Sequence, residues 1–146
     1  MSLLGICLAW AGSTGAAATP PVFVPAPPYT LAWTHSVERV RWEEDYRVVR
    51  DADGAPRLVL TEARVQGSAA GMEPPEDAVL DGVWYRYRPH TALPAVLRLT
   101  RSPYTADYEL CTASVPCQTM ERWLPHSGAG EITLLWACES PGQPRR

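Results

Sequence analysis

The sequence contains no lysine, so that all 13 of its basic residues are arginines. These arginines are scattered along the chain, and the formal net charge is -3. Proteins that bind nucleic acids usually concentrate basic side chains on one surface, so this distribution argues against a nucleic-acid partner. The sequence also has no glycine-rich phosphate loop, no heptad repeat and no internal repeat. Their absence argues against a P-loop nucleotide-binding protein, a coiled coil and a repeat protein.

Charged side chains are also absent from the first 29 residues. An apolar run from Leu3 to Trp10 is followed by small residues that end at Ala18. This order resembles a secretory leader or an inner-membrane anchor over residues 1–18, and it predicts a periplasmic or otherwise extracytoplasmic protein. The alternative is an ordinary buried helix, because no basic residue precedes the run and eight apolar residues are too few to span a bilayer. Five prolines in residues 19–28 predict an extended tether between this segment and a domain.

Cysteine is scarce, with four residues in the chain. If Cys7 belongs to a leader, three cysteines remain, and an oxidising compartment then predicts one disulfide and one free thiol. Cys111 and Cys117 are favoured as the disulfide because a short turn separates them. Cys138 is in phase with neighbouring apolar residues and is expected to be a small buried side chain, while its pairing with Cys117 is the alternative. No C-x-x-C motif or histidine spacing accompanies these cysteines, so no metal site is expected at them.

Alternation of apolar and polar side chains predicts an all-β fold. The expected strands are Thr30–Ser36, Trp42–Arg50, Pro56–Gln66, Val83–Arg88, Ala95–Arg101, Asp107–Thr112 and Glu131–Cys138. Asp53 and Gly54 form a strong hairpin signal between the second and third of these, because glycine provides the positive φ that such turns require. Residues 118–124 are expected to form a short helix. The sequence therefore predicts a single sandwich or small barrel of about seven antiparallel strands over residues 29–139, with one or two short helical turns and a flexible tail over residues 140–146.

A group of polar residues shares the phase of core side chains on the first strands. Its members are His35, Glu38, Glu44 and Glu62. A buried carboxylate needs a partner, so we expect Glu44 to meet His35 or Arg64 inside the domain. A hydrogen-bonded cluster that fixes strand register is the favoured interpretation, and a small-ligand or divalent-metal site is the alternative. Acid–base catalysis is less favoured, and Ser36 points to the face opposite His35, which argues against a hydrolase.

Residues 67–82 form a long segment that is rich in small and acidic residues. Gly71, Met72 and Glu73 are its candidate contact residues, because glycine permits a bend and methionine adapts to varied surfaces. A lid or docking loop and a loop packed over one end of the fold are equally consistent with this composition. A helical turn is expected over Glu76–Leu80. The five tryptophans that follow Trp10 are interpreted as core residues in preference to a ligand site.

Several short motifs occur together in a fixed order. They are W-T-H-S-V-E at 33–38, W-E-E-D-Y at 42–46, A-G-M-E-P-P-E at 70–76, G-V-W-Y at 82–85, L-P at 93–94 and Y-E-L-C at 108–111, followed by Cys117 and Cys138. This order resembles the domain of unknown function 1850 family over residues 30–138. The resemblance implies a small exported bacterial protein that is encoded beside tripartite ATP-independent periplasmic (TRAP) transporters of the TAXI type. It assigns no catalytic residue and no cofactor.

These observations together predict a non-enzymatic, exported accessory protein that assists a TAXI-type TRAP transporter of solutes. Its expected partner is the membrane transporter or the transporter's solute-binding protein, and residues 3–10 are the expected membrane tether. A periplasmic module that binds a small ligand or a divalent metal through the polar group is the alternative, and a hydrolase is the least favoured. No cofactor is expected.

Overall fold

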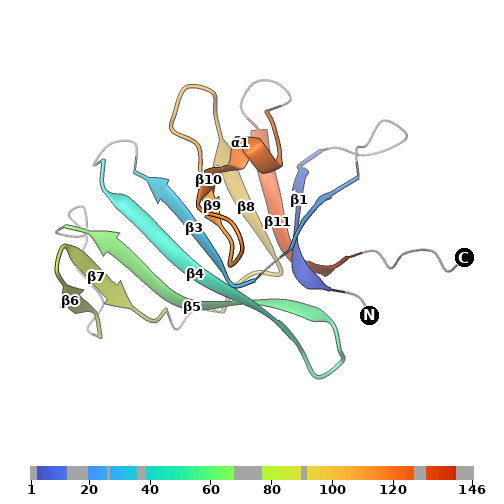
Figure 1. Ribbon diagram of the computed structural model, residues 1–146, viewed down its shortest axis with the longest axis horizontal. Coiled ribbons are helices and arrows are strands. Elements are labelled where there is room, and N and C mark those ends of the chain that lie inside the picture. The colour runs from blue at the N-terminus through green and yellow to red at the C-terminus, as the bar shows by residue number, and fades with distance from the viewer. Residues whose placement is uncertain are drawn as a thin grey trace, which may run out of the picture.

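The protein is a sandwich-like arrangement of two antiparallel sheets, as the computed structural model in Figure 1 shows. The structure describes residues 3–12, 20–25, 27–35, 39–67, 77–89, 92–126 and 131–140. The smaller sheet has the strand order β2-β1-β11-β8, and the larger has the order β10-β9-β3-β4-β5-β7-β6. The all-β prediction is therefore confirmed, with a sandwich in place of the alternative barrel.

Each of the seven strands expected from the sequence is present, with bounds close to the predicted ones. The smaller sheet contains β1 (Leu4–Trp10), β2 (Val22–Val24), β8 (Val96–Arg101) and β11 (Glu131–Glu139). The larger contains β3 (Tyr29–Thr34), β4 (Arg41–Arg50), β5 (Pro56–Gln66), β6 (Val79–Asp81), β7 (Trp84–Tyr87), β9 (Glu109–Cys111) and β10 (Gln118–Thr119), and α1 spans Met120–Trp123. Within the described residues, no helix has the length and hydropathy that crossing a membrane requires.

The core lies between the two sheets and contains side chains from both. Leu31 and Leu110 of the larger sheet and Leu8 and Leu135 of the smaller sheet are almost completely buried. The Tyr29 hydroxyl crosses from β3 to the other sheet and donates a hydrogen bond of 2.5 Å to the Val24 carbonyl. Burial raises the pKa of Tyr29 to about 12, so its phenol remains a donor at neutral pH.

The segment predicted to be a leader is a strand of the domain. β1 pairs with β11 along its whole length and with β2 on its other side. Ile6 and Leu8 are 1% and 0% exposed, and a Cβ on Gly5 would lie 2.6 Å from the Val24 carbonyl oxygen. The predicted division into leader, tether and domain is therefore wrong for these residues, because a short apolar run is equally typical of a buried strand.

Two disulfides connect the four cysteines. Cys111 and Cys117 are joined to each other, which is the pair that the sequence favoured. Cys7 and Cys138 form the second bond, which links β1 to β11 across a sequence separation of 131 residues. The expectation of a free thiol at Cys138 is therefore wrong, because it depended on assigning Cys7 to a leader.

The hairpin of β4 and β5 confirms the strongest local signal in the sequence. Gly54 has a φ of 82°, and its amide donates to the Asp51 carbonyl at 2.9 Å. The Asp51 carboxylate accepts hydrogen bonds from the amides of Asp53 and Ala55. This side chain caps the turn and sets the register of the two longest strands.

A bulge in the same hairpin changes which side chains of β5 point inward. Tyr46 pairs with Leu60 but Asp45 pairs with Glu62, so Thr61 is the extra residue. Leu58 and Leu60 face the core before the bulge, whereas buried Ala63 and Val65 face it afterwards. The bulge therefore inverts the phase of β5 and turns Glu62 to the outer face of the sheet.

Two further segments differ from their predictions. Val79 to Asp81 form the edge strand β6 and pair with β7, although a helical turn was expected over Glu76–Leu80. Glu76 itself is outside the described residues, as is the tail over residues 141–146. Gln118 and Thr119 pair with β9 as β10, so the helix expected over residues 118–124 is confined to Met120–Trp123. Strand pairing overrides helical patterning in both segments.

Candidate functional site

A pocket of about 470 Å³ opens between the two sheets. We call it the inter-sheet pocket. Leu31 of β3 and Leu97 and Leu99 of β8 form apolar walls, and Leu93 and Pro94 close one side. Its remaining lining residues are Trp33, Glu44, Tyr46, Val96, Arg98 and Tyr108. The pocket therefore combines an apolar surface with a few polar groups, as small-molecule sites usually do.

Glu44 is the carboxylate of this pocket, and it points inward as the period-two pattern predicted. It lies beside Leu31 on β3 and Ala63 on β5, both of which are buried. The Tyr46 hydroxyl donates to Glu44 Oε1 at 3.0 Å. Burial raises the pKa of Glu44 despite this hydrogen bond. Burial, and then the charge of Glu44, raise the pKa of Tyr46, which keeps its phenol protonated and able to donate.

Aromatic rings of Trp33, Tyr46 and Tyr108 line the same pocket as this carboxylate. Trp33 stacks on Trp42 with ring centroids 6.2 Å apart and planes at 5°, and Tyr108 lies 5.9 Å from Trp33. Burial followed by the charge of Glu44 raises the pKa of Tyr108, and the same two causes act on Tyr87. The field of Glu44 therefore extends to tyrosines on both sides of β4. Core packing and ligand binding were the two roles weighed for the tryptophans. Trp33 packs against the core and also lines the pocket.

His35 does not share the partly buried environment of Glu44. It follows the end of β3 and is exposed, with its amide donating to Val40 and its carbonyl accepting from Arg39. The expected convergence of the two side chains in one interior layer is therefore wrong, because β3 ends at Thr34. Glu38 and Ser36 are outside the described residues, and so are the loop residues Gly71, Met72 and Glu73.

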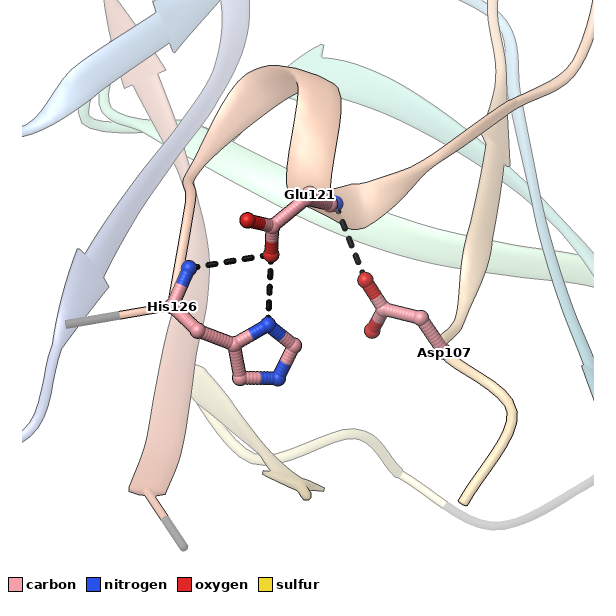
Figure 2. A group of neighbouring side chains, drawn as sticks. All are labelled: Asp107, Glu121 and His126. Atoms are coloured by element: carbon pink, nitrogen blue, oxygen red, sulfur yellow. Dashed lines mark hydrogen bonds and ion pairs between the residues drawn. The ribbon is translucent and has the colours of Figure 1, made fainter. Parts of the chain in front are cut away.

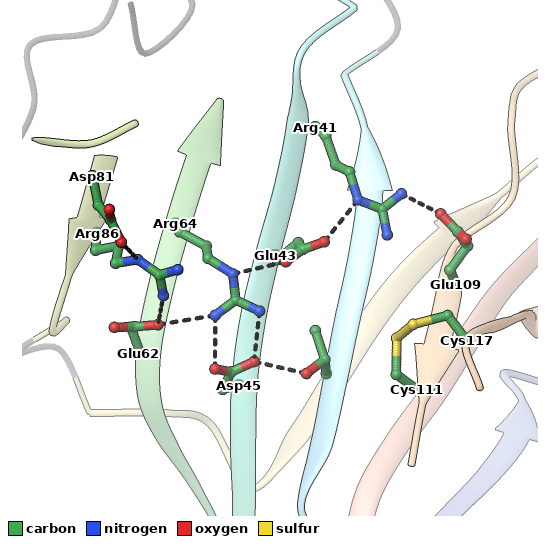
Figure 3. Close-up of polar contacts among 11 residues, drawn as sticks. Arg41, Glu43, Asp45, Glu62, Arg64, Asp81, Arg86, Glu109, Cys111 and Cys117 are labelled. Carbon is green, nitrogen blue, oxygen red and sulfur yellow. Dashed lines mark hydrogen bonds and ion pairs between the residues drawn. A yellow bond between two sulfur atoms is a disulfide. The ribbon is translucent and has the colours of Figure 1, made fainter. Parts of the chain in front are cut away.

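Glu62 is on the face of the larger sheet opposite Glu44, where Figure 3 shows it among alternating charges. Arg64 donates to Glu43 at 2.7 Å, to Asp45 at 2.7 Å and to Glu62 at 2.9 Å. Arg86 donates to Glu62, and also to Asp81 at 3.0 Å. The full set, which we call the charged ladder, comprises Arg41, Glu43, Asp45, Glu62, Arg64, Asp81, Arg86 and Glu109. Arg64 is therefore not the partner of Glu44 that was expected, and the expected convergence of Glu62 with Glu44 on one face is wrong.

The charged ladder crosses strands from β9 to β6 and stabilises their register. Burial opposes ionisation of Glu43 and Asp45, but hydrogen bonds from arginine outweigh it and lower both pKa values. Burial likewise opposes the charge of Arg64, and the carboxylates of Asp45 and Glu43 raise its pKa. Each of these three partly buried charges thus has a partner of opposite sign. This arrangement is typical of a structural face.

A third polar group, at the end of α1, was missed by the sequence analysis. Ligand atoms of Asp107, Glu121 and His126 lie within 4.8 Å of one another, and carboxylates with imidazole suit a divalent metal. Figure 2 shows, however, that Glu121 Oε2 already contacts the His126 ring and backbone amide, while Asp107 accepts from the Glu121 amide. Arg101 also contacts both carboxylates. This adjacent positive charge opposes a cation, so the group fits an internal ion-pair network better than a metal site.

Arg101 is the centre of that network, and its guanidinium is completely buried. It donates to both Asp107 carboxylate oxygens, at 2.9 and 3.0 Å, and to the Leu124 carbonyl at 2.8 Å. The Trp10 ring lies beneath it, 4.8 Å from the guanidinium carbon. In the sequence, Arg101 follows Leu97 and Leu99 at alternate positions of one strand. This alternation could have indicated that the Arg101 side chain points inward.

Glu44→Gln tests whether burial of the charged carboxylate opposes folding. Because the native pKa of Glu44 is raised above its ordinary 4.5, the native state holds the proton more tightly than the unfolded state. The contribution of Glu44 to stability is therefore most favourable below pH 4.5 and is lost as pH rises through the native pKa. We expect E44Q to be more stable than the native protein at pH 7, with the difference shrinking towards pH 4. Thermal unfolding of both proteins between pH 4 and pH 7 measures the difference in their stability. A stability difference that does not change with pH would contradict the prediction.

Comparison with known families gives one match. The family model described as "Domain of unknown function (DUF1850)" matches residues 29–118, from the start of β3 to the start of β10. No curated protein and no solved structure matches the chain. The matched region contains Glu44, the charged ladder and the Cys111–Cys117 disulfide, and it excludes β1 and β11.

Proposed function

The chain belongs to the DUF1850 family, and we propose that it is a non-enzymatic module that binds a small molecule outside the cytoplasm in the service of solute uptake. The observation that carries this proposal is Glu44 in the inter-sheet pocket. Among the described residues, Tyr46 is the hydrogen-bond donor to this partly buried carboxylate, and no arginine forms an ion pair with it. A partly desolvated charge without an opposite charge opposes folding, and its presence in a pocket is typical of a binding function.

The size and the lining of the pocket support this proposal. Its volume of about 470 Å³ is within the range of roughly 300–1,000 Å³ that small-molecule sites occupy. Val96 is 39% exposed at the pocket, whereas Leu31 and Leu99 are buried deeper. A ligand entering past Val96 would exchange water for apolar walls and reach Glu44 and Tyr46.

The extracytoplasmic location is supported by the disulfides. Both cysteine pairs are oxidised, and disulfides persist mainly in oxidising compartments. Residues 3–10 do not add to the support for this location. Most of them belong to β1, which pairs with β11 and carries Cys7 of the Cys7–Cys138 disulfide. Mass analysis of protein recovered from the periplasm under nonreducing conditions is expected to find no free thiol.

An accessory role beside a transporter is the second candidate, and the edge of the larger sheet favours it. Val79 and Leu80 on β6 and Val83 in the following turn are 65%, 58% and 61% exposed. An exposed apolar edge strand offers unpaired backbone groups to a partner. We propose a component of a TAXI-type transporter as that partner. Leu80→Arg is expected to reduce copurification with the transporter proteins without affecting the pocket, and unchanged copurification would contradict this role for the edge.

Blocking the pocket tests the binding function. We expect Val96→Trp to fill the opening, while Val79→Trp places the same ring at an exposed site far along the other sheet and is the control. A panel of amines, amino acids, carboxylates and sugars is screened by thermal shift. A ligand at 100 times its Kd stabilises the native state by about 2.7 kcal/mol. At least one panel member should stabilise the native protein and V79W but not V96W. If no member does so, or if V96W responds equally, the proposal is wrong.

A further inference from the structure

We propose that the inter-sheet pocket binds an organic cation, with Glu44 as the counter-ion of its ammonium group and with Trp33 and Tyr108 as aromatic walls. This inference rests on the proposed binding function and names its ligand class. Glu44 lines a largely apolar pocket, and the aromatic side chains of Trp33 and Tyr108 line the same pocket and contact each other. A cationic ligand would neutralise the charge of this partly buried carboxylate, whose hydrogen-bond donor among the described residues is one phenol.

The arrangement of charges around Glu44 favours a cation over an anion as its neighbour in the pocket. Within the part of the chain that the structure describes, the field of Glu44 reaches the titratable groups of Tyr46 on β4, Tyr108 before β9 and Tyr87 on β7, and all three have raised pKa values. They are therefore neutral at pH 7. Arg64, the nearest arginine along the paired strand β5, contacts the charged ladder on the opposite face of the sheet. No positive side chain of the described residues contacts Glu44, so a bound ligand would supply the positive charge beside it.

The aromatic rings supply a second attraction for a cation. Trp33 lines the pocket, and its stacked partner Trp42 holds the ring in place. Tyr108 is tilted by 54° to Trp33, so the two rings form adjoining walls. An ammonium group over such ring faces is attracted by their quadrupoles, most strongly where water is excluded. A carboxylate together with aromatic faces recognises an ammonium group by two independent interactions.

Among the described residues, Arg98 is the positive side chain of the pocket lining, and it separates two interpretations of the pocket. It is exposed on β8, whereas Glu44 is partly buried on β4. In the cation site, the arginine opposes the ligand's charge from the pocket entrance, so Arg98→Ala strengthens binding. If a protonated Glu44 instead donated a hydrogen bond to an anionic ligand, the arginine would assist binding and the same substitution would weaken it.

The experiment compares cations with neutral molecules of the same shape. Choline is paired with 3,3-dimethylbutan-1-ol and isoamylamine with isoamyl alcohol, and binding is measured by calorimetry and by tryptophan fluorescence at pH 7.5. At least one cation should bind saturably and at least tenfold more tightly than its neutral partner. E44Q should lose at least tenfold in affinity for that cation, V96W should lose binding, and R98A should bind it more tightly. Affinity should fall as pH is lowered and Glu44 takes up a proton.

The outcomes separate this inference from the proposed function. If neither cation binds, or if the neutral partner binds equally well, the inference is wrong. If E44Q retains full affinity, Glu44 is not the counter-ion and the inference is also wrong. Binding of a neutral or anionic panel member that V96W abolishes would leave the proposed function standing, whereas no pocket-dependent binding at all would remove both. Circular dichroism confirms that E44Q is folded, and the pH dependence of the native protein gives the same answer without any substitution.

Discussion

Arg101→Ala is expected to destabilise the domain by about 3–5 kcal/mol, because it leaves the buried Asp107 carboxylate without its opposite charge. The Asp107 side chain is 12% exposed, and it accepts two hydrogen bonds from the guanidinium. The loss also removes the donor to the Leu124 carbonyl and the cation that stacks on Trp10. Breaking such a pair costs more than the pair itself contributes, since one charge stays buried and unpaired.

The position of Arg101 explains why the effect should extend through the fold. Its guanidinium connects β8 to the residue after α1, to Thr133 on β11 and, through the Trp10 ring, to β1. Asp107 in turn accepts from the amides of Tyr108 and Glu121. Arg101 therefore connects the smaller sheet to the α1 region, and its removal should destabilise the packing between them.

Chemical unfolding measures this effect, and Arg98→Ala is the matched control. Arg98 is on the same strand but exposed, so its removal should change stability by no more than about 0.5 kcal/mol. Arg101→Lys should restore only part of the stability, because an ammonium group cannot reproduce the two parallel bonds to Asp107. A loss below about 1 kcal/mol in R101A would show that the network contributes little and would contradict this account.

Removal of the Cys7–Cys138 disulfide is expected to cost about 5 kcal/mol by chain entropy, whereas removal of Cys111–Cys117 should cost about 2 kcal/mol. The difference follows from sequence separations of 131 and 6 residues, since a longer loop restricts the unfolded chain more. The long bond also holds β1 to β11 at the middle of the smaller sheet. Its loss therefore removes a covalent link between β1 and β11 in the native state, and it also gives the unfolded chain more conformational freedom.

Paired alanine substitutions test the disulfides, with C7A/C138A compared with C111A/C117A in denaturant. The first pair should lose about 2–3 kcal/mol more than the second, and its m-value should rise because the unfolded chain is less compact. Equal losses would show that the entropy of the long loop is not what stabilises the domain. A larger loss in C111A/C117A would indicate that the β9 and β10 region depends on its short bond.

Much of the fold was accessible from local patterns. The β4–β5 hairpin follows from Gly54 and from alternation along the two strands, and the inward direction of Glu44 follows from the same alternation. The pairing of Cys111 with Cys117 required only a short turn. Each of these features is set by residues close together in the chain, where backbone geometry leaves few alternatives.

Other features of the candidate site were beyond such reasoning. Glu62 was expected beside Glu44, but one extra residue at Thr61 turns it to the other face. His35 was expected inside the domain and is exposed beyond the end of β3. The inter-sheet pocket itself is formed by side chains of β3, β4 and β8 and by Leu93, so no single stretch of sequence contains it.

Alternation along the chain was sufficient to establish an all-β domain, its main hairpin and an inward-facing glutamate, because these depend on neighbouring residues. Packing between distant segments established the rest. The apolar run at Leu4–Trp10 is compatible with a leader until β11 pairs with it, and Arg101 is an ordinary strand residue until Asp107 and Trp10 enclose it. Free energies of burial and ion pairing depend on all the groups that exclude water, and these groups come together only in the folded chain.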